Sequence, residues 1–247
     1  MVITLYQQDI LWAQPDANRR QAEAALEGSH GDIFVLPETF TTGFGDHMAA
    51  LAEPPGGPTL QWAQQMAARH DMLLVGTWIV KVNGCCYNRL HWIYPDGTHG
   101  HYDKAHTFRV SGEADQIGRG TERPTFEYKG WRIRPAVCYD LRFPKWLRNE
   151  GLDYDLLLLC ANWPASRREA WSTLLRARAI ENLCYVAGCN RTGTDPHGSL
   201  YTGDSAVVDY KGLPLQPSTD GLFLTATLDR ERLAAFRERW PFHLDFD

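Results

Sequence analysis

Short apolar runs alternate along the chain with longer stretches that are apolar on one side only. Short runs that alternate or are continuously apolar are typical of β-strands, whereas apolar positions three or four residues apart are typical of helices. The predicted strands are 2–8, 33–36, 72–80, 87–94, 98–103, 126–128, 131–137, 156–160, 184–189, 205–210 and 222–227. The predicted helices are 16–27, 58–70, 144–149, 166–182 and 229–237, the last with Asp229 as its N-cap.

This order of elements predicts a layered α/β fold, because strands and helices interleave along the chain. Turns at 95–97 and 129–130 join neighbouring strands as hairpins, so the sheets should be mixed rather than purely parallel. The Gly-, Asp- and Pro-containing stretch 190–203 is expected to be a loop. Because no linker or repeat interrupts the pattern, we expect one domain over residues 1–247, with two sheets and helices outside them.

Composition narrows the class of protein. Apolar residues make up 44% of the 247 residues and the net charge is −5, which argues against a disordered chain and against a general nucleic-acid binder. No apolar run approaches the roughly 20 residues that cross a bilayer, and the N-terminus lacks the pattern of a signal peptide. Six cysteines without a C-x-x-C pair indicate reduced thiols, so we expect a cytoplasmic protein without membrane association.

Three polar or reactive side chains stand where predicted strands end. Glu38 follows the strand 33–36, Lys104 follows 98–103, and Cys138 follows 131–137. A cysteine between a strand and a turn resembles a nucleophile elbow, in which backbone N–H groups point at the substrate. Taken singly, each residue has a more ordinary interpretation: a solvated glutamate, a surface lysine and a core cysteine. We expect the other five cysteines to be packing residues.

Histidines cluster near Lys104, at positions 99, 101 and 106. Two of them share one face of a strand, so a metal site is conceivable. No accompanying Cys or Asp arrangement supports it, and we expect structural or surface histidines and no metal.

Taken together and in this order, the three segments resemble the motifs of the nitrilase superfamily, the carbon–nitrogen hydrolases. The similarity spans nearly the whole chain. It is carried by LPETF (36–40), DKAHTF (103–108), VCYDLRFP (137–144), ANWP (161–164), ARAIEN (177–182), GCNR (188–191), GDS (203–205) and RERWPF (237–242). Within the superfamily, the segments CYDLRFP and CANWPA resemble the ω-amidase branch, whose members hydrolyse the terminal amide of 2-oxoglutaramate and related compounds.

The resemblance implies a four-layer α-β-β-α sandwich and a homodimer, with the C-terminal Trp240-Pro-Phe segment as a tail that often reaches the partner. It also implies a second glutamate after the lysine segment, which Glu113 matches and which would orient Lys104 or the incoming water.

The chemistry of amide hydrolysis then assigns the other roles. Cys138 is the expected nucleophile, Glu38 the proton carrier, and Lys104 with the backbone N–H of Tyr139 the stabilisers of the oxyanion. The expected intermediate is a thioester on Cys138. These groups cover each step, so we expect no cofactor and a small-molecule amide as the binding partner.

The carboxylate of an ω-amidase substrate needs a cation, ideally a bidentate one. Arg142 is the candidate, and an ion pair with a nearby acid is an equally good interpretation of it. Phe44 and Trp163 are candidates for the pocket wall, with core packing as the alternative, and Asn162 is a weaker candidate for orienting a group in the pocket. Two other functions stay open: a different nitrilase-superfamily amidase, nitrilase or carbamoyl-amine hydrolase, and a noncatalytic binding member.

Overall fold

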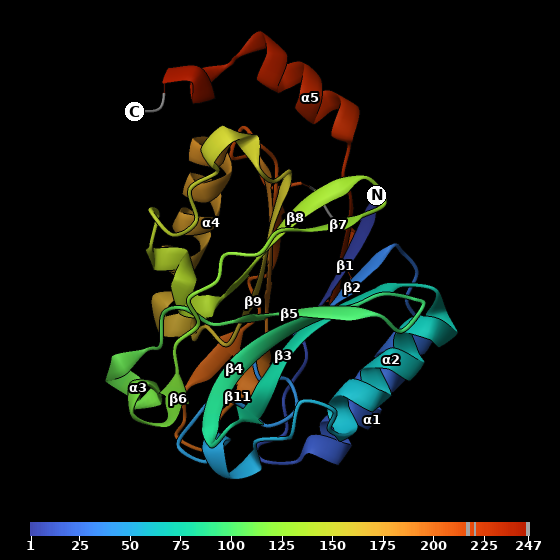
Figure 1. Cartoon of the computed structure of the whole chain (residues 1–247), viewed down its shortest axis with the longest axis vertical. Helices are drawn as coiled ribbons and strands as arrows, with labels where there is room; N and C mark the ends of the chain where they lie inside the picture. The colour runs from blue at the N-terminus through green and yellow to red at the C-terminus, as the bar shows by residue number, and fades with distance from the viewer. Residues whose placement is uncertain (216–217, 220, 246–247) are drawn as a thin grey trace.

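Two β-sheets pack face to face, with helices on both outer sides (Figure 1). The computed structural model describes residues 1–215, 218–219 and 221–245. Its helices are α1 (Pro15–Glu27), α2 (Pro58–His70), α3 (Glu113–Gln116), α4 (Arg168–Asn182) and α5 (Arg230–Arg239). Short 3-10 helices are η1 (Met48–Leu51), η2 (Arg109–Ser111), η3 (Cys138–Arg142), η4 (Glu150–Leu152), η5 (Ala165–Arg167) and η6 (Phe242–Asp245).

The first sheet contains the N-terminal strands and the last two strands of the described chain. Its members are β1 (Val2–Tyr6), β2 (Ile33–Val35), β3 (Leu73–Val82), β4 (Cys85–Ile93), β5 (His99–Asp103), β6 (Ile117–Gly118), β14 (Ser218–Thr219) and β15 (Phe223–Thr227). Their order is β14-β15-β1-β2-β3-β4-β5, with β6 beside β4. Strands β1, β2 and β3 run parallel, whereas β3, β4 and β5 are joined antiparallel.

The second sheet is built from the middle of the chain. It comprises β7 (Phe126–Tyr128), β8 (Trp131–Val137), β9 (Leu156–Ala161), β10 (Tyr185–Asn190) and β13 (Ala206–Val208). In the order β13-β10-β9-β8-β7, the three central strands are parallel and the edge strands antiparallel. The predicted α/β sandwich with mixed sheets is therefore confirmed.

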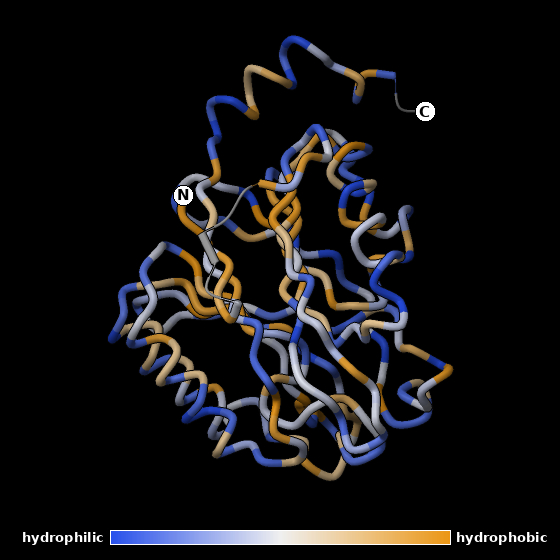
Figure 2. The backbone as a smooth tube through the Cα atoms, turned by 180° about the vertical axis from the view of Figure 1, so that it is seen from behind, coloured by the Kyte–Doolittle hydropathy of each residue, from blue (hydrophilic) through white to orange (hydrophobic). Residues whose placement is uncertain are grey.

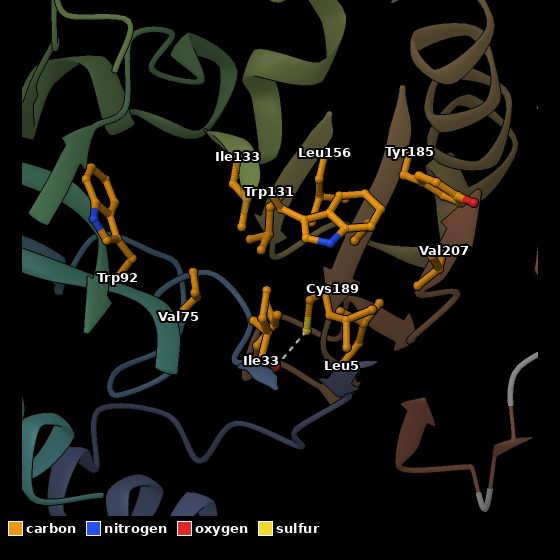
Figure 3. Packing of buried hydrophobic residues seen from close by; sticks show 14 of the residues in the cluster. Leu5, Ile33, Val75, Trp92, Trp131, Ile133, Leu156, Tyr185, Cys189 and Val207 are labelled. Carbon is orange, nitrogen blue, oxygen red and sulfur yellow. Dashed lines mark hydrogen bonds between the residues drawn. The ribbon is translucent and has the colours of Figure 1, made fainter. Parts of the chain in front are cut away.

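Alternation along the strands explains why both faces of each sheet are covered. Leu156 and Leu158 of β9 face the core between the sheets, where they join Ile33 and Val35 of β2. Figure 3 shows this layer. The Cys189 sulfur lies 3.3 Å from the carbonyl oxygen of Val35 and 3.4 Å from that of Tyr6, and so connects the two sheets. A strand buried on both faces is apolar at nearly every position, as the sequence shows for 156–160.

The outward-facing positions of the same strands pack against the helices. Leu157 and Leu159 contact the apolar side of α4, and Phe34 of β2 contacts that of α1 and α2. Figure 2 shows hydrophobic colour along the strands and mixed colour along the helices, as expected for helices with one buried side. Helix α5 extends beyond the layers (Figure 1) and is held there by Arg237, which donates to Asp155 at 2.6 Å.

Most predicted elements are present with shifted ends, and 58–70, 126–128 and 131–137 match in full. The expected N-cap is confirmed, since the Asp229 carboxylate accepts from the backbone N–H of Arg232 at 2.9 Å. Helix α4 begins at Arg168, after the short helix η5.

Three expectations were wrong. No helix spans 144–149: the chain makes a turn there, because the N–H of Asn149 donates to the Asn182 side chain at 2.9 Å instead of to a helical carbonyl. The stretch 190–203 is not a plain loop, since β11 (Thr192–Thr194) and β12 (Leu200–Thr202) form a hairpin in it. Among the five other cysteines, Cys85 is exposed and only the remaining four are buried. Among the described residues, no helix is long and apolar enough to cross a membrane.

Candidate active site

Cys138 lies at the sharp turn between β8 and η3. Its φ is +43°, a left-handed conformation that costs energy for a residue with a side chain. The turn is held by Asp140, whose carboxylate accepts the backbone N–H of Val137 at 3.0 Å. The strand-to-turn position predicted from the sequence is therefore present, with backbone strain at Cys138.

Glu38 reaches the same place from the other sheet. It follows β2, and its backbone N–H donates to the carbonyl oxygen of Ala161 at the end of β9, 3.2 Å away. Its side-chain Oε2 accepts the backbone N–H of Asn162 at 2.9 Å. These two bonds join the sheets at the carboxyl ends of their parallel strands. Glu38 is completely buried at this junction.

Lys104 lies between two carboxylates. Its Nζ is 2.8 Å from Glu38 Oε1, and 3.0 and 2.9 Å from the two oxygens of Glu113. All three side chains have no exposed surface. Glu113 is held in turn by the backbone N–H of Phe108, at 2.6 Å from its Oε2. The sequence predicted these three residues as one group, and the structure brings them together.

Burial and neighbouring charges shift the pKa values of this group. Burial raises the pKa of Glu38, an effect that Lys104 opposes and Glu113 reinforces. Burial alone would lower the pKa of Lys104, but the charges of Glu113 and Glu38 outweigh it and the pKa is raised. Burial and the charge of Glu38 also raise the pKa of the Cys138 thiol well above its usual range. Lys104 is therefore a permanent cation, and the thiol keeps its proton until a base removes it.

A cavity of about 430 Å³ opens in front of these groups. Cys138 and Lys104 lie in its wall, and so do all four residues predicted to contact a substrate: Phe44, Tyr139, Arg142 and Trp163. The Phe44 ring centroid is 5.1 Å from the Lys104 ammonium. Trp163 lies in the cavity wall and also packs in the apolar cluster beneath α4, so both the pocket-wall and the core-packing interpretation apply to it.

Arg142 lies exposed at the edge of the cavity, with its guanidinium 4.9 Å from the Trp163 ring centroid. No ion pair joins it to another described residue, so the ion-pair interpretation is wrong for the described part of the chain. Arg167, which sequence reasoning missed, lines the same cavity and packs 5.2 Å from the Phe108 ring centroid. Its only sequence signal was its place shortly after the ANWP segment.

Sequence reasoning also missed Asn88 of β4. Its Nδ2 donates to Glu38 Oε1 at 2.8 Å and to Glu113 Oε1 at 3.3 Å. An amide at a central position of a predicted strand was the available signal, because a buried polar group needs a partner.

The histidines near Lys104 do not gather around a common point. His106 Nδ1 is 2.7 Å from Asp140, and its ring stacks on Phe143 with centroids 3.7 Å apart. His99 and His101 lie on β5. Within the described ranges, no group of three His, Cys, Asp or Glu side chains is arranged to hold a metal ion.

A fold of two sheets between helices, with a cysteine and a lysine in the wall of one cavity and two buried glutamates bonded to that lysine, defines a class of hydrolase. Residues 2–238 match the family model for the carbon-nitrogen hydrolases, and the chain belongs to this family.

Several similar proteins are named as amidases. The chain is 45% identical to omega-amidase YafV of Yersinia enterocolitica, over 99% of this chain and 96% of the relative. It is 34% identical to the 2-oxoglutaramate amidase of Bacillus subtilis, over 97% and 95% of the two chains. The crystal structure of XC1258 from Xanthomonas campestris, a CN-hydrolase superfamily protein with an arsenic adduct in its active site, superimposes with a TM-score of 0.96. It is 43% identical, with 100% of this chain and 97% of that chain covered.

Removing the ammonium from this buried cluster should destabilise the fold. Lys104→Met leaves two carboxylates facing each other without a cation, and we expect a loss of about 3–5 kcal/mol in the free energy of unfolding, measured by urea denaturation. The matched control is Lys129→Met, because Lys129 forms a half-exposed ion pair with Asp32 and should contribute less than about 1 kcal/mol. Equal losses in the two variants would contradict this account.

Proposed function

We propose that this protein is an ω-amidase that releases ammonia from the terminal amide of 2-oxo dicarboxylic acid monoamides such as 2-oxoglutaramate. The observation that carries the proposal is the buried Glu38–Lys104–Glu113 cluster beside a strained Cys138, at the wall of a cavity that also has arginines. Identity of 45% over nearly the full length with a protein named omega-amidase supports the substrate class.

The first half of the proposed reaction forms a thioester. The Cys138 sulfur attacks the amide carbon as its proton passes to Glu38, because the raised pKa of the thiol requires a base in contact. Glu38 then gives this proton to the amide nitrogen, the C–N bond breaks and ammonia leaves. In the second half, water attacks the thioester while Glu38 takes a proton from it. The C–S bond breaks, and that proton returns to the sulfur.

The negative oxygen formed in both halves is stabilised by Lys104 and by the backbone N–H of Tyr139. The Lys104 nitrogen is nearly equidistant from the two Glu113 oxygens, a geometry in which one N–H is shared between both. A second N–H points to Glu38 Oε1. Since an ammonium has three donors, the third is left for the oxyanion.

Glu113 orients Lys104 rather than water in this scheme. Each of its oxygens accepts two bonds: Oε1 from Lys104 and Asn88, and Oε2 from Lys104 and the backbone N–H of Phe108. A carboxylate offers about four acceptor positions, so none remains to bind an incoming water.

The central test is the loss of the nucleophile. Cys138→Ala should abolish ammonia release from 2-oxoglutaramate, since Cys138 is the only described cysteine that lines the cavity. The wild-type protein, quenched during turnover, should gain the mass of the acyl group on the peptide that contains Cys138. Ammonia release from a simple nitrile at a rate matching that from the ω-amide would favour a nitrilase instead. Full activity of the variant would overturn the mechanism.

Arg142 is proposed to hold the substrate carboxylate. Its guanidinium lines the cavity and has no acidic partner among the described side chains, so both of its forked donors are available. Arg142→Leu should raise KM for 2-oxoglutaramate by roughly 10- to 100-fold, as expected for the loss of a charge-assisted hydrogen bond.

Two comparisons sharpen this test. An uncharged amide of similar length should be hydrolysed equally well by Arg142→Leu and the wild type. Arg167→Leu is the matched variant at the other cavity arginine; if its KM effect were the larger one, Arg167 would hold the carboxylate.

The protein is further proposed to form a homodimer. Past α5, the side chains of Trp240, Phe242 and Leu244 are 46%, 51% and 73% exposed, an apolar surface that favours a protein contact. Sedimentation velocity should give twice the chain mass of 28.1 kDa, and a chain ending at Arg239 should dissociate more readily. The mass of a single chain at micromolar concentration would contradict the dimer.

A further inference from the structure

Asn88 is buried completely in the middle of β4, yet one of its two polar side-chain atoms has no hydrogen-bond partner among the described residues. Its Nδ2 donates to both carboxylates of the cluster, at 2.8 Å from Glu38 Oε1 and 3.3 Å from Glu113 Oε1. Only a donor fits between two carboxylates, so the orientation of the amide is settled. Its Oδ1 then points away and accepts no hydrogen bond from any described residue.

A buried acceptor without a partner is destabilising. An apolar side chain at this position would avoid this cost. The strand itself does not need the amide, because its main-chain hydrogen bonds do not involve the side chain; for example, the carbonyl oxygen of Asn88 accepts the backbone N–H of Lys104 at 3.0 Å. The side chain is therefore explained by what its Nδ2 does to the carboxylates, not by packing.

The bonds to Glu38 are divided unequally between its two oxygens. Oε1 accepts from both Lys104 and Asn88, which occupies the two acceptor positions of that oxygen. Among the hydrogen bonds of the described residues, Oε2 accepts that of the Asn162 backbone N–H alone and has one position left. The same N–H also acts on the Cys138 thiol, where it opposes the rise of the thiol pKa, so the thiol lies near this N–H and therefore on the Oε2 side of the carboxylate.

We propose that Asn88 is a positioning residue which, together with Lys104, saturates Glu38 Oε1 and so makes Oε2 the oxygen that takes the thiol proton and hands it to the leaving ammonia. This inference rests on the proposed amidase mechanism. Asn88 itself touches no reacting atom; it acts through Glu38.

Loss of the Asn88 donor should make Glu38 easier to protonate. The charged groups acting on Glu38 are the ammonium of Lys104, which favours the carboxylate, and the carboxylate of Glu113, which disfavours it; the thiols of Cys138 and Cys160 are also coupled to it. A hydrogen bond from Asn88 stabilises the ionised form in addition to Lys104. Without it, the pKa of Glu38 rises, and a higher pH is needed before it can act as a base.

The test is Asn88→Leu, which is similar in size and has no donor. The probe is alkylation of Cys138 by iodoacetamide, followed over pH by the mass of the peptide that contains Cys138. We expect the acid-side midpoint of the alkylation rate to move up by about one to two pH units, from the loss of one hydrogen bond to a charged group. With 2-oxoglutaramate as the substrate, the kcat of Asn88→Leu should be lower than that of the wild type at neutral pH, while KM changes little.

Asn182→Leu is the matched control. Asn182 is also fully buried and also has one polar side-chain atom without a partner, but it bonds to Asn149, away from the cavity. Its alkylation midpoint should equal that of the wild type. Should Asn88→Leu fail to fold, Asn88→Ser carries the test: the shorter side chain leaves room for a water donor, and the midpoint should move in the same direction by a smaller amount.

An unchanged midpoint in the folded Asn88 variant, or an equal shift in Asn182→Leu, would overturn the role of Asn88. Because alkylation needs no substrate, this outcome is separate from a failure of the proposed function. If the wild type did not hydrolyse ω-amides while the midpoint still moved, the substrate would be wrong and the role of Asn88 would stand.

Discussion

One buried ammonium, that of Lys104, organises the site. Two carboxylates without exposed surface lie within 3.0 Å of it, and neither could stay ionised there without a cation. Because Glu38 follows β2, whereas Lys104 follows β5 and Glu113 begins α3 nine residues later, this ion cluster also joins two parts of the chain that are 66 residues apart. The surrounding residues bury this cluster and supply the remaining hydrogen bonds to its two carboxylates.

The second sheet completes this arrangement through its strand ends. The backbone at Ala161 and Asn162 binds both the main chain and the side chain of Glu38, and β8 delivers Cys138 in a left-handed conformation. Asp140 accepts from Val137, His106 and the Tyr102 hydroxyl, so the turn that bears the cysteine is tied directly to the segment that bears the lysine. The backbone strain at Cys138 is tolerated because the buried hydrogen bonds of Asp140 fix the turn on one side and the segment next to Lys104 on the other.

Local pattern predicted most of the strands and helices, because alternating or helically spaced apolar residues respond to burial on one face. It failed where side chains redirect the backbone. At 144–149 the Asn182 side chain takes the N–H of Asn149, and no local rule foresees a partner so far along the chain. Asn88 was passed over for a similar reason: its partners, Glu38 and Glu113, come from segments that meet only in the folded chain.

By itself, the sequence determined the layered α/β class, the family to which the chain belongs, and the three segments that contain Glu38, Lys104 and Cys138. These follow from residue type and spacing, which are local properties of the chain. Only the tertiary structure decided how the hydrogen bonds divide between the two oxygens of Glu38, that Glu113 accepts bonds from Lys104, Asn88 and Phe108, and that Arg167 lines the cavity with Arg142. Hydrogen-bond saturation and pKa depend on distances and burial across two sheets, and no single segment carries that information.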